Sequence, residues 1–201
     1  DLKWLRMNGL EAAVLKQASD GTLVMGICGG YQMLGMTLED PDGVEEGGSM
    51  RGMELLPVHT VFEKAKTRTR VLGMTEALNG PWQLLSGIAF EGYEIHMGET
   101  TYEPGAAVFS TIAETAGTHN GKGSSANGCQ YQNAAGSYVH GIFDEKLVSE
   151  GIVSAILKQK GYDTLQIEGK DWNSYKEEQY DQLADILRES LDMKAIYKMM
   201  E

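Results

Sequence analysis

Apolar residues recur at helical spacing at both ends of the chain and in short strand-like runs in the middle. The first segment, of about 18 residues, has a helical pattern that stops at Ser19–Gly21 and predicts a surface helix. The apolar run at 22–27 has the composition of a buried parallel strand, and the segment 28–35 begins like a helix. The expected order is therefore helix, strand, sharp turn, helix.

The middle of the chain predicts a run of strands separated by loops. Residues 39–52 are rich in Gly, Asp and Glu and are expected to form a surface loop. Residues 115–136 contain little apolar material and are expected to form a long mobile loop or a pair of loops. Apolar character returns at 137–144, which places a histidine at the end of a strand. The strands expected before it are 55–62, 67–73, 88–97 and 107–113.

The last third of the chain carries two apolar stripes at helical spacing, one ending at Gly161 and a longer one from Trp172 to Ile196. No internal repeat is present. Helices at both ends with strands between them predict an α/β fold, a three-layer sandwich around a largely parallel sheet. A chain of 201 residues can bury a core of its own, so we expect one domain over 1–201.

The composition narrows the classes of function. With 17 Lys and Arg against 29 Asp and Glu, the formal charge is -12, which disfavours nucleic acid and anionic membrane surfaces as partners. No stretch approaches the roughly 18 apolar residues that a membrane span needs. The two cysteines have no zinc-like spacing, so we expect no metal site and a reducing, cytoplasmic setting.

The segment Gly26–Gly30 has the G-x-C-x-G form of a nucleophile elbow, placed after an apolar strand and before a helix. Because this turn is tight, glycine is expected to be required at both flanking positions. The thiol of Cys28 would then lie at a helix N-terminus, where the helix dipole is expected to lower its pKa. The N–H of Gly29 would point toward an oxyanion that forms on an attacked carbonyl.

A buried packing residue is the alternative interpretation of any free cysteine, because cysteine is among the residue types most often found inside proteins. We keep that interpretation for Cys129, which lies in a segment of Gly, Asn and Gln. The elbow pattern reverses it for Cys28, for which we predict a nucleophile.

A cysteine nucleophile needs a base, and the chain has four histidines. His140 ends a short apolar run and is the preferred base. His96, in a strand-like segment flanked by Gly92 and Gly98, is the second choice for the base. His59 is predicted to be a half-exposed strand residue, and His119 is expected to be solvated in the mobile loop.

Residues 26–35 resemble the nucleophile motif of class I (triad-type) glutamine amidotransferases, and their Gly-Gly-Tyr-Gln form resembles the cobyric acid synthase branch. The resemblance implies a class I glutamine amidotransferase-like (flavodoxin-like) fold, with Cys28 and His140 as the catalytic pair. It covers nearly the whole chain, because further segments agree in the same order. They are 40–45, 66–71, 92–98 and 138–144.

The resemblance also implies a role in cobalamin (vitamin B12) biosynthesis. In that family, glutamine supplies ammonia for the ATP-dependent amidation of carboxylates on a corrinoid, adenosylcobyrinic acid a,c-diamide. An N-terminal synthetase domain of the same enzyme handles ATP (with Mg) and the corrinoid. That partner domain is expected to be absent from this chain, which contains no GxxxxGK[ST] phosphate loop. We expect glutamine as the substrate and no cofactor in this domain.

Two departures from the family pattern bear on the site. Class I enzymes commonly place a glutamate two residues after the histidine, where this chain has Ile142. The imidazole would be oriented by a backbone carbonyl, by Asp144 or Glu94, or by no ionised group. The second oxyanion donor of this fold comes from a strand that would precede Asp1, so we expect a truncation at the N-terminal strand or strands.

Glutamine is expected to lie with its carboxamide over the thiol and its oxygen toward Gly29. By resemblance and location, Gln32 and Glu94 are further candidates for substrate binding. An arginine could bind the α-carboxylate of glutamine in a bidentate manner. For any single arginine, however, a solvated position on the surface is the more common role. The three candidates, among which the sequence does not choose, are Arg51, Arg68 and Arg70.

Other functions stay open at this point. The cobyrinic acid a,c-diamide synthase branch and an amidotransferase acting on a cell-wall lipid intermediate share the cysteine elbow, but the segment 92–98 favours cobyric acid synthase. A non-catalytic module that docks a corrinoid or a partner is the alternative from another class, given the missing glutamate and the acidic composition. An α/β-hydrolase is disfavoured because the chain has no serine elbow.

Overall fold

The computed structural model describes residues 1–114, 123–162, 169 and 171–200. None of the helices in these ranges is long and apolar enough to cross a membrane. The helices are α1 (Leu2–Met7), α2 (Leu10–Ser19), α3 (Gly29–Leu34), the 3-10 helices η1 (Gly80–Leu85) and η2 (Ile142–Asp144), α4 (Lys146–Gln159), α5 (Trp172–Ser190) and α6 (Met193–Met200). The strands are β1 (Val24–Ile27), β2 (Thr37–Asp40), β3 (Gly48–Arg51), β4 (Val58–Thr75), β5 (Ala89–Tyr102), β6 (Ala107–Glu114), β7 (Ser125–Tyr131), β8 (Ala134–Ser137) and β9 (Val139–His140).

The strands form one mixed sheet in the order β1-β8-β7-β6-β4-β2-β3, with β5 paired to β4 and β9 paired to β5. Within the described residues, parallel pairing is confined to β1–β8 and β2–β4. The prediction of a largely parallel sheet was therefore wrong. Consecutive strands are antiparallel where the connection is short, as between β7 and β8, because a short turn returns the chain alongside itself.

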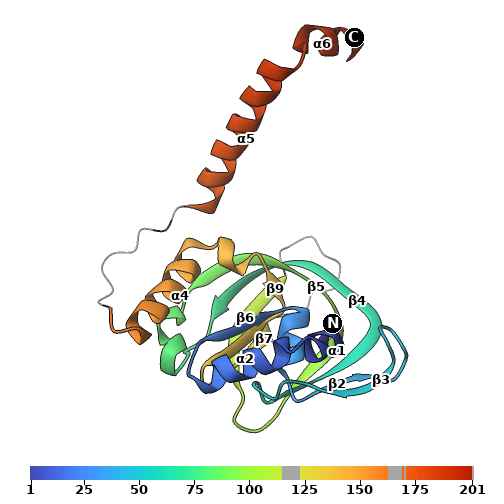
Figure 1. Ribbon diagram of the computed structural model, residues 1–201, viewed down its shortest axis with the longest axis vertical. Helices are drawn as coiled ribbons and strands as arrows, with labels where there is room; N and C mark the ends of the chain where they lie inside the picture. Colours follow the sequence, from blue (N-terminus) through green and yellow to red (C-terminus); the bar gives the residue numbers. More distant parts are fainter. Residues whose placement is uncertain (115–122, 163–168, 170, 201) are drawn as a thin grey trace.

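Helices cover both faces of this sheet, which confirms the predicted α/β sandwich (Figure 1). On one face, α4 and η1 pack on a core that includes Trp82, Phe109 and Val148. On the other face, α1 and α3 pack on a second core that includes Tyr31 and Cys129. The cysteine predicted to have only a packing role is thus fully buried in a strand.

Strands β7 and β8 occupy most of the described part, 123–136, of the segment predicted to be a loop at 115–136, and 115–122 lie outside the described residues. All of β8 is buried although its residues are small. A Cβ on Gly136 would overlap the ring of Tyr31, so small residues let α3 lie directly against the strand. The low apolar content reflects close packing here. The loop prediction was wrong for 125–131 and 134–136, which form the two strands, while 132–133 form the turn between them.

Two predicted helices are each divided. The helix predicted at the start of the chain forms two helices, α1 and α2. They are separated at Gly9, whose φ of 73° breaks the helical conformation. The longer apolar stripe of the last third is divided into α5 and α6.

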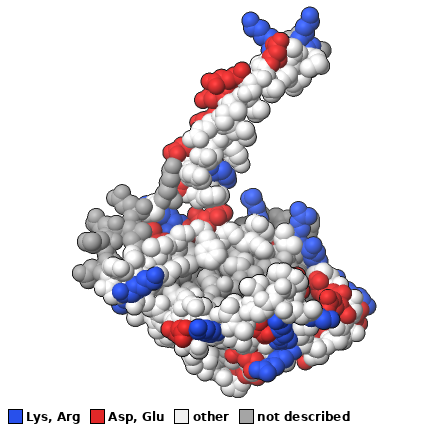
Figure 2. Space-filling model, viewed as in Figure 1, with Lys and Arg blue, Asp and Glu red and all other residues white. Residues whose placement is uncertain are grey.

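Helix α5 is amphipathic but buries none of its residues. Figure 1 shows it extending away from the sheet, and Figure 2 shows acidic side chains along one side of it beside an uncharged surface. The apolar spacing predicted the helix correctly, but its apolar stripe does not join either core. The large apolar side chains of α5 are 37% to 59% exposed, and they are Trp172, Tyr175, Tyr180, Leu183, Ile186 and Leu187.

Candidate active site

The predicted elbow is present between β1 and α3. Cys28 has φ 53° and ψ -114°, a conformation that a residue with a Cβ rarely adopts and that stores strain. A Cβ on Gly26 would lie 2.5 Å from the carbonyl carbon of Gly30, so glycine is required at position 26. The requirement predicted for position 30 is wrong, because a Cβ there would meet open space.

Backbone hydrogen bonds hold the elbow on the sheet. The N–H of Cys28 donates to the carbonyl of Ser137 at 2.9 Å, and its own carbonyl accepts from the N–H of Gln32 at 3.1 Å, which opens α3. The thiol donates to the carbonyl of Ile95 at 3.4 Å. The sulfur is therefore held between the end of β1 and strand β5.

Burial raises the pKa of the Cys28 thiol above its ordinary value. The N–H of Gly29 donates to the sulfur and lowers that pKa, and the negative charge of Glu94 raises it. The net direction is upward, so the lowered pKa predicted from the helix N-terminus was wrong. Helix α3 has only six residues, so its dipole is weak. The carboxylate of Glu94, which raises the pKa of the thiol, comes from β5, far from the elbow in sequence.

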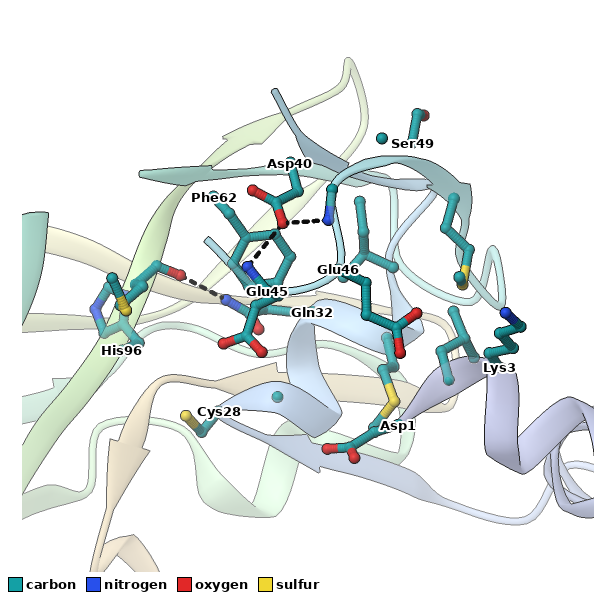
Figure 3. Close-up of a pocket in the computed structure, with 18 of the residues that line it drawn as sticks. Asp1, Lys3, Cys28, Gln32, Asp40, Glu45, Glu46, Ser49, Phe62 and His96 are labelled. Carbon is teal, nitrogen blue, oxygen red and sulfur yellow. Dashed lines mark hydrogen bonds between the residues drawn. The ribbon is translucent and has the colours of Figure 1, made fainter. Parts of the chain in front are cut away.

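The elbow opens into a cavity of about 650 Å³ (Figure 3). We call the lining residues nearest the elbow the floor, and the lining residues on and around the 40–48 loop the rim. The floor consists of Cys28, Gly29, Gln32, Ile95, His96 and Met97, and the rim consists of Asp40, Glu45, Glu46, Gly47 and Gly48.

Gln32 is a buried floor residue whose amide is fixed by two partners. Its Nε2 donates to the carbonyl of Met97 at 3.2 Å and to the hydroxyl of Tyr138 at 3.3 Å. That hydroxyl is 2.5 Å from the hydroxyl of Thr100. Burial raises the pKa of Tyr138, although the hydrogen bonds with Thr100 and Gln32 oppose this. The phenol therefore stays neutral and anchors Gln32 beneath the pocket.

The carboxylate of Asp40 organises the rim. It accepts from the N–H groups of Val44 at 2.7 Å and of Glu45 and Gly47 at 2.8 Å each. Burial would raise the pKa of Asp40, but these donors together lower it. Figure 3 shows the carboxylates of Glu45 and Glu46 extending from this loop toward the floor. The rim is thus an acidic loop folded around one charged side chain.

The cations that line the cavity in the described part of the chain are Lys3 and Lys66. The three candidate arginines lie outside this lining. Arg51 is 73% exposed and pairs with Glu54 at 2.6 Å. Arg68 is exposed on β4, as is Arg70. All three arginines are therefore exposed surface residues, as the alternative interpretation predicted. The sequence interpretation overlooked Lys66, which lies in the same segment as Arg68 and Arg70.

His140 ends the short strand β9, as predicted. It pairs with Tyr93 of β5, and directly opposed residues share a face, so the two rings stack with centroids 5.2 Å apart. His140 lies just beyond Ser137, whose carbonyl binds the elbow, but it is not among the residues that line the cavity.

The second histidine, His96, does line the cavity. Its ring stacks on Tyr138 with centroids 3.8 Å apart, and its Nε2 is 3.6 Å from Oε1 of Glu94. His59 is partly exposed on β4, as predicted, and bonds Thr37 at 2.7 Å and Glu103 at 2.8 Å. His119 lies outside the described residues.

Glu94, a predicted substrate contact, is buried beside the floor but is not part of the cavity lining. Its Oε1 accepts from Nδ2 of Asn127 at 2.6 Å. In the β5–β9 pairing, the residue opposite it is Val139. The carboxylate therefore belongs to a buried network that reaches Asn127 and His96, and it also acts on the Cys28 thiol.

A family profile described as "CobB/CobQ-like glutamine amidotransferase domain" matches residues 1–148, which include the elbow, the cavity and β9. The chain belongs to this family. Within this amidotransferase domain, the cysteine elbow and the strand that carries His140 both lie in the matched segment.

Relatives of this amidotransferase domain carry the name "Cobyric acid synthase". The one from Ruminiclostridium cellulolyticum is 48% identical over 204 residues, which cover 100% of this chain and 39% of the relative. The one from Lachnoclostridium phytofermentans is 48% identical over 209 residues, which cover 100% of this chain and 40% of the relative. The chain thus spans about two fifths of the length of these relatives.

A solved structure titled "Structure of PurLQS from Thermotoga maritima" superposes on this amidotransferase domain with a TM-score of 0.50. The sequences are 18% identical, and the match covers 75% of this chain and 68% of that chain. At this identity the likeness concerns the fold alone. It confirms the predicted class I glutamine amidotransferase-like fold.

Sequence reasoning missed the rim and Asn127. The segment 40–45 was one of those that carry the family resemblance, and its Asp-Pro-Asp-Gly turn was noted, so a signal for the rim existed. Asn127 gave no such signal, because it lay in a segment that was interpreted as a loop.

Proposed function

We propose that this chain is the glutaminase domain of a cobyric acid synthase, which hydrolyses glutamine and supplies ammonia for the amidation of corrinoid carboxylates. The observation that carries the proposal is the strained cysteine elbow, which opens into a cavity within the family-matched segment. The names of the two relatives support the cobyric acid synthase branch.

The first step moves the thiol proton. Because burial and Glu94 raise the pKa of Cys28, the thiol rests protonated at neutral pH and needs a base. His140 accepts this proton while the sulfur attacks the carboxamide carbon of glutamine. The N–H of Gly29, which donates to the sulfur at rest, then donates to the oxyanion.

Collapse of the tetrahedral intermediate releases ammonia. His140 gives its proton to the leaving nitrogen, the C–N bond breaks, and a glutamyl thioester remains on Cys28. A water molecule then attacks the thioester carbon and passes a proton to the same histidine. The C–S bond breaks, the sulfur takes that proton back, and glutamate leaves.

The cavity lining supplies charges that suit the two ends of glutamine. Its α-ammonium group would pair with Glu45 or Glu46, which line the cavity. Its α-carboxylate would pair with Lys66, a cation of the cavity lining. This assignment replaces the three arginines, since they lie outside that lining.

The rest of the reaction is proposed to belong to a synthetase domain. The chain spans about two fifths of its relatives, which leaves room in a whole enzyme for a domain that binds ATP with Mg and the corrinoid. No cofactor is proposed for this amidotransferase domain itself. A cytoplasmic setting would suit its two free cysteines.

Labelling by an electrophilic glutamine analogue tests the proposal. We expect stoichiometric modification of Cys28, detected by mass spectrometry and slowed by added glutamine. Cys129→Ala is the matched control, because Cys129 is fully buried and burial raises its pKa to about 12. The control should label like wild type, and Cys28→Ala should not label. A thiol at position 28 that ignores the analogue would favour a non-catalytic docking module instead.

Glutamate release, with and without an added synthetase domain, measures turnover directly. We expect release to be abolished in Cys28→Ala and to increase when the synthetase domain is present. Equal release by Cys28→Ala and wild type would show that the nucleophile is a different group.

A further inference from the structure

Asn127 on β7 is a buried residue that the catalytic scheme leaves without a role. Asn127 is only 3% exposed, and both ends of its side-chain amide are hydrogen-bonded. Nδ2 donates to Oε1 of Glu94 at 2.6 Å, and Oδ1 accepts from Oγ of Ser137 at 2.8 Å and from the N–H of Tyr138 at 3.3 Å. These partners fix the orientation of the amide, because a reversed amide would present its N–H groups to two donors.

Ser137 connects this amide to the elbow. Its hydroxyl donates to Asn127 and accepts from the N–H of Val139 at 3.0 Å. Its carbonyl accepts from the N–H of Cys28 at 2.9 Å. A continuous path of hydrogen bonds and backbone therefore runs from Cys28 through Ser137 and Asn127 to Glu94, and we call it the polar brace.

The polar brace also reaches the strand of the base. Glu94 pairs with Val139 in the β5–β9 ladder, and the next pair is Tyr93 with His140. The brace therefore joins β7, the end of β8 and strand β5 at the place where the imidazole is held. A displacement of one of these strands would change the separation between the nucleophile and its base, to which reaction rates are sensitive.

We propose that Asn127 is a positioning residue for glutamine hydrolysis, which keeps the cysteine elbow and the strand of His140 in register through Ser137 and Glu94. The inference rests on the proposed function, because the positions of Cys28 and His140 matter only if these residues hydrolyse glutamine. Asparagine suits the position because one planar group offers a donor to the carboxylate and an acceptor to the hydroxyl. Such a buried network is strong when every member is satisfied and costly when one is not.

The groups around the polar brace determine what a substitution does. The titratable groups near it include Glu94 and His96 on β5, Cys28 at the elbow, Tyr138 after β8, His140 on β9, and Tyr102, which donates to the carbonyl of Gly128. Asn127→Asp would set a second carboxylate against Glu94, and the two would repel unless one takes up a proton. The defect should therefore shrink as the pH falls, which a simple loss of packing would not cause.

The experiment measures the rate of Cys28 alkylation against pH with two probes. One is the electrophilic glutamine analogue, and the other is iodoacetamide, which needs no glutamine site. In Asn127→Asp both rates should fall about tenfold or more at a pH of about 8, because the elbow is displaced and the added charge keeps the thiol protonated. The ratio of variant to wild type should rise toward one as the pH is lowered to about 5.

A double variant reverses the polarity of the central bond. In Glu94→Gln with Asn127→Asp, the new amide donates to the new carboxylate, and the hydroxyl of Ser137 and the N–H of Tyr138 still have an acceptor. Rates with both probes should return to within about threefold of wild type, since the two substitutions are coupled through one bond. The double variant should therefore react faster than Asn127→Asp at neutral pH.

Asn133→Asp is the matched control. Asn133 also donates through Nδ2, to the carbonyls of Ala18 at 2.9 Å and Thr22 at 2.6 Å, but it lies at the β7–β8 turn. For Asn133→Asp, the alkylation rate relative to wild type should stay close to one at every pH and with both probes. A melting curve for each variant establishes that the chain is folded.

Three results would overturn the role of Asn127: wild-type rates in Asn127→Asp, a ratio that does not change with pH, or a double variant no faster than Asn127→Asp. Failure of the proposed function looks different. In that case the glutamine analogue would not label wild type, while the iodoacetamide ratios would still report whether Asn127 positions the thiol.

Discussion

The floor and the rim of the cavity differ in how they are held. The floor is fixed by contacts between distant parts of the chain, including the bond from Cys28 to Ser137 and the tight approach of Gly26 to α3. The rim is held by local bonds, because Asp40 binds backbone groups within seven residues of itself. The floor is therefore part of the core, whereas the rim is a loop between β2 and β3 that depends chiefly on its own hydrogen bonds.

This difference matches what each part must do. Strained backbone such as that of Cys28 persists only where the surrounding structure determines it, and reacting atoms need fixed positions. Binding the charged ends of a substrate tolerates small adjustments of a loop. Floor substitutions should accordingly lower kcat or stability, and rim substitutions should raise KM.

The largest effect is expected for the base. His140→Asn should lower kcat for glutamate release by about 10²- to 10⁴-fold, the usual contribution of a general base. His96→Asn is the comparison, because His96 lines the cavity but is assigned no proton transfer. It should stay within about tenfold of wild type. The opposite ranking in steady-state assays would make His96 the base.

A stability difference between two elbow glycines is the next largest effect. Gly26→Ala should lower the free energy of unfolding by about 2–3 kcal/mol, because its Cβ would lie 2.5 Å from a backbone carbon. Gly30→Ala has open space in helix α3 and should be neutral or stabilising by up to about 1 kcal/mol. Urea denaturation of both variants measures this. Equal losses would mean that the elbow is not sterically determined at Gly26.

A smaller effect is expected at the rim anchor. Asp40→Ala should raise KM for glutamine about tenfold, with kcat little changed. Because the pKa of Asp40 is lowered in the folded loop, its stabilising effect is present above the ordinary pKa and is lost as the pH falls through the lowered value. In wild type, the amides of Val44 and Glu45 should stay protected from exchange at neutral pH and lose protection only in acid. A matching fall in kcat would place Asp40 with the floor.

The smallest effects are expected for the rim carboxylates. Glu45→Gln and Glu46→Gln should each raise KM by about threefold, the usual strength of a partly solvated charge pair. Added salt should weaken glutamine binding in wild type more than in the variant that lacks the contact. If neither variant changes KM, the α-ammonium group must bind elsewhere.

Part of this site could be predicted because it depends on neighbours in sequence. The elbow follows from the steric needs of a tight turn, and its strained conformation was found at Cys28. The catalytic pair remains a prediction that the labelling and His140 experiments test. The pKa of Cys28 was predicted in the wrong direction, because burial and the charge of Glu94 arise only when β5 packs beside the elbow. The buried strands β7 and β8 were missed because small residues in close contact resemble a loop in composition.

By itself, the sequence determined which regions form α-helices, several of the strands and the cysteine elbow, because these depend on apolar spacing and on sterics within a few residues. The tertiary structure alone decided which polar groups meet. It placed Asn127 against Glu94, Lys66 rather than an arginine in the cavity, and the apolar stripe of α5 outside both cores. The physical reason is that such meetings depend on strand register and on how closely elements approach, which are properties of the whole fold.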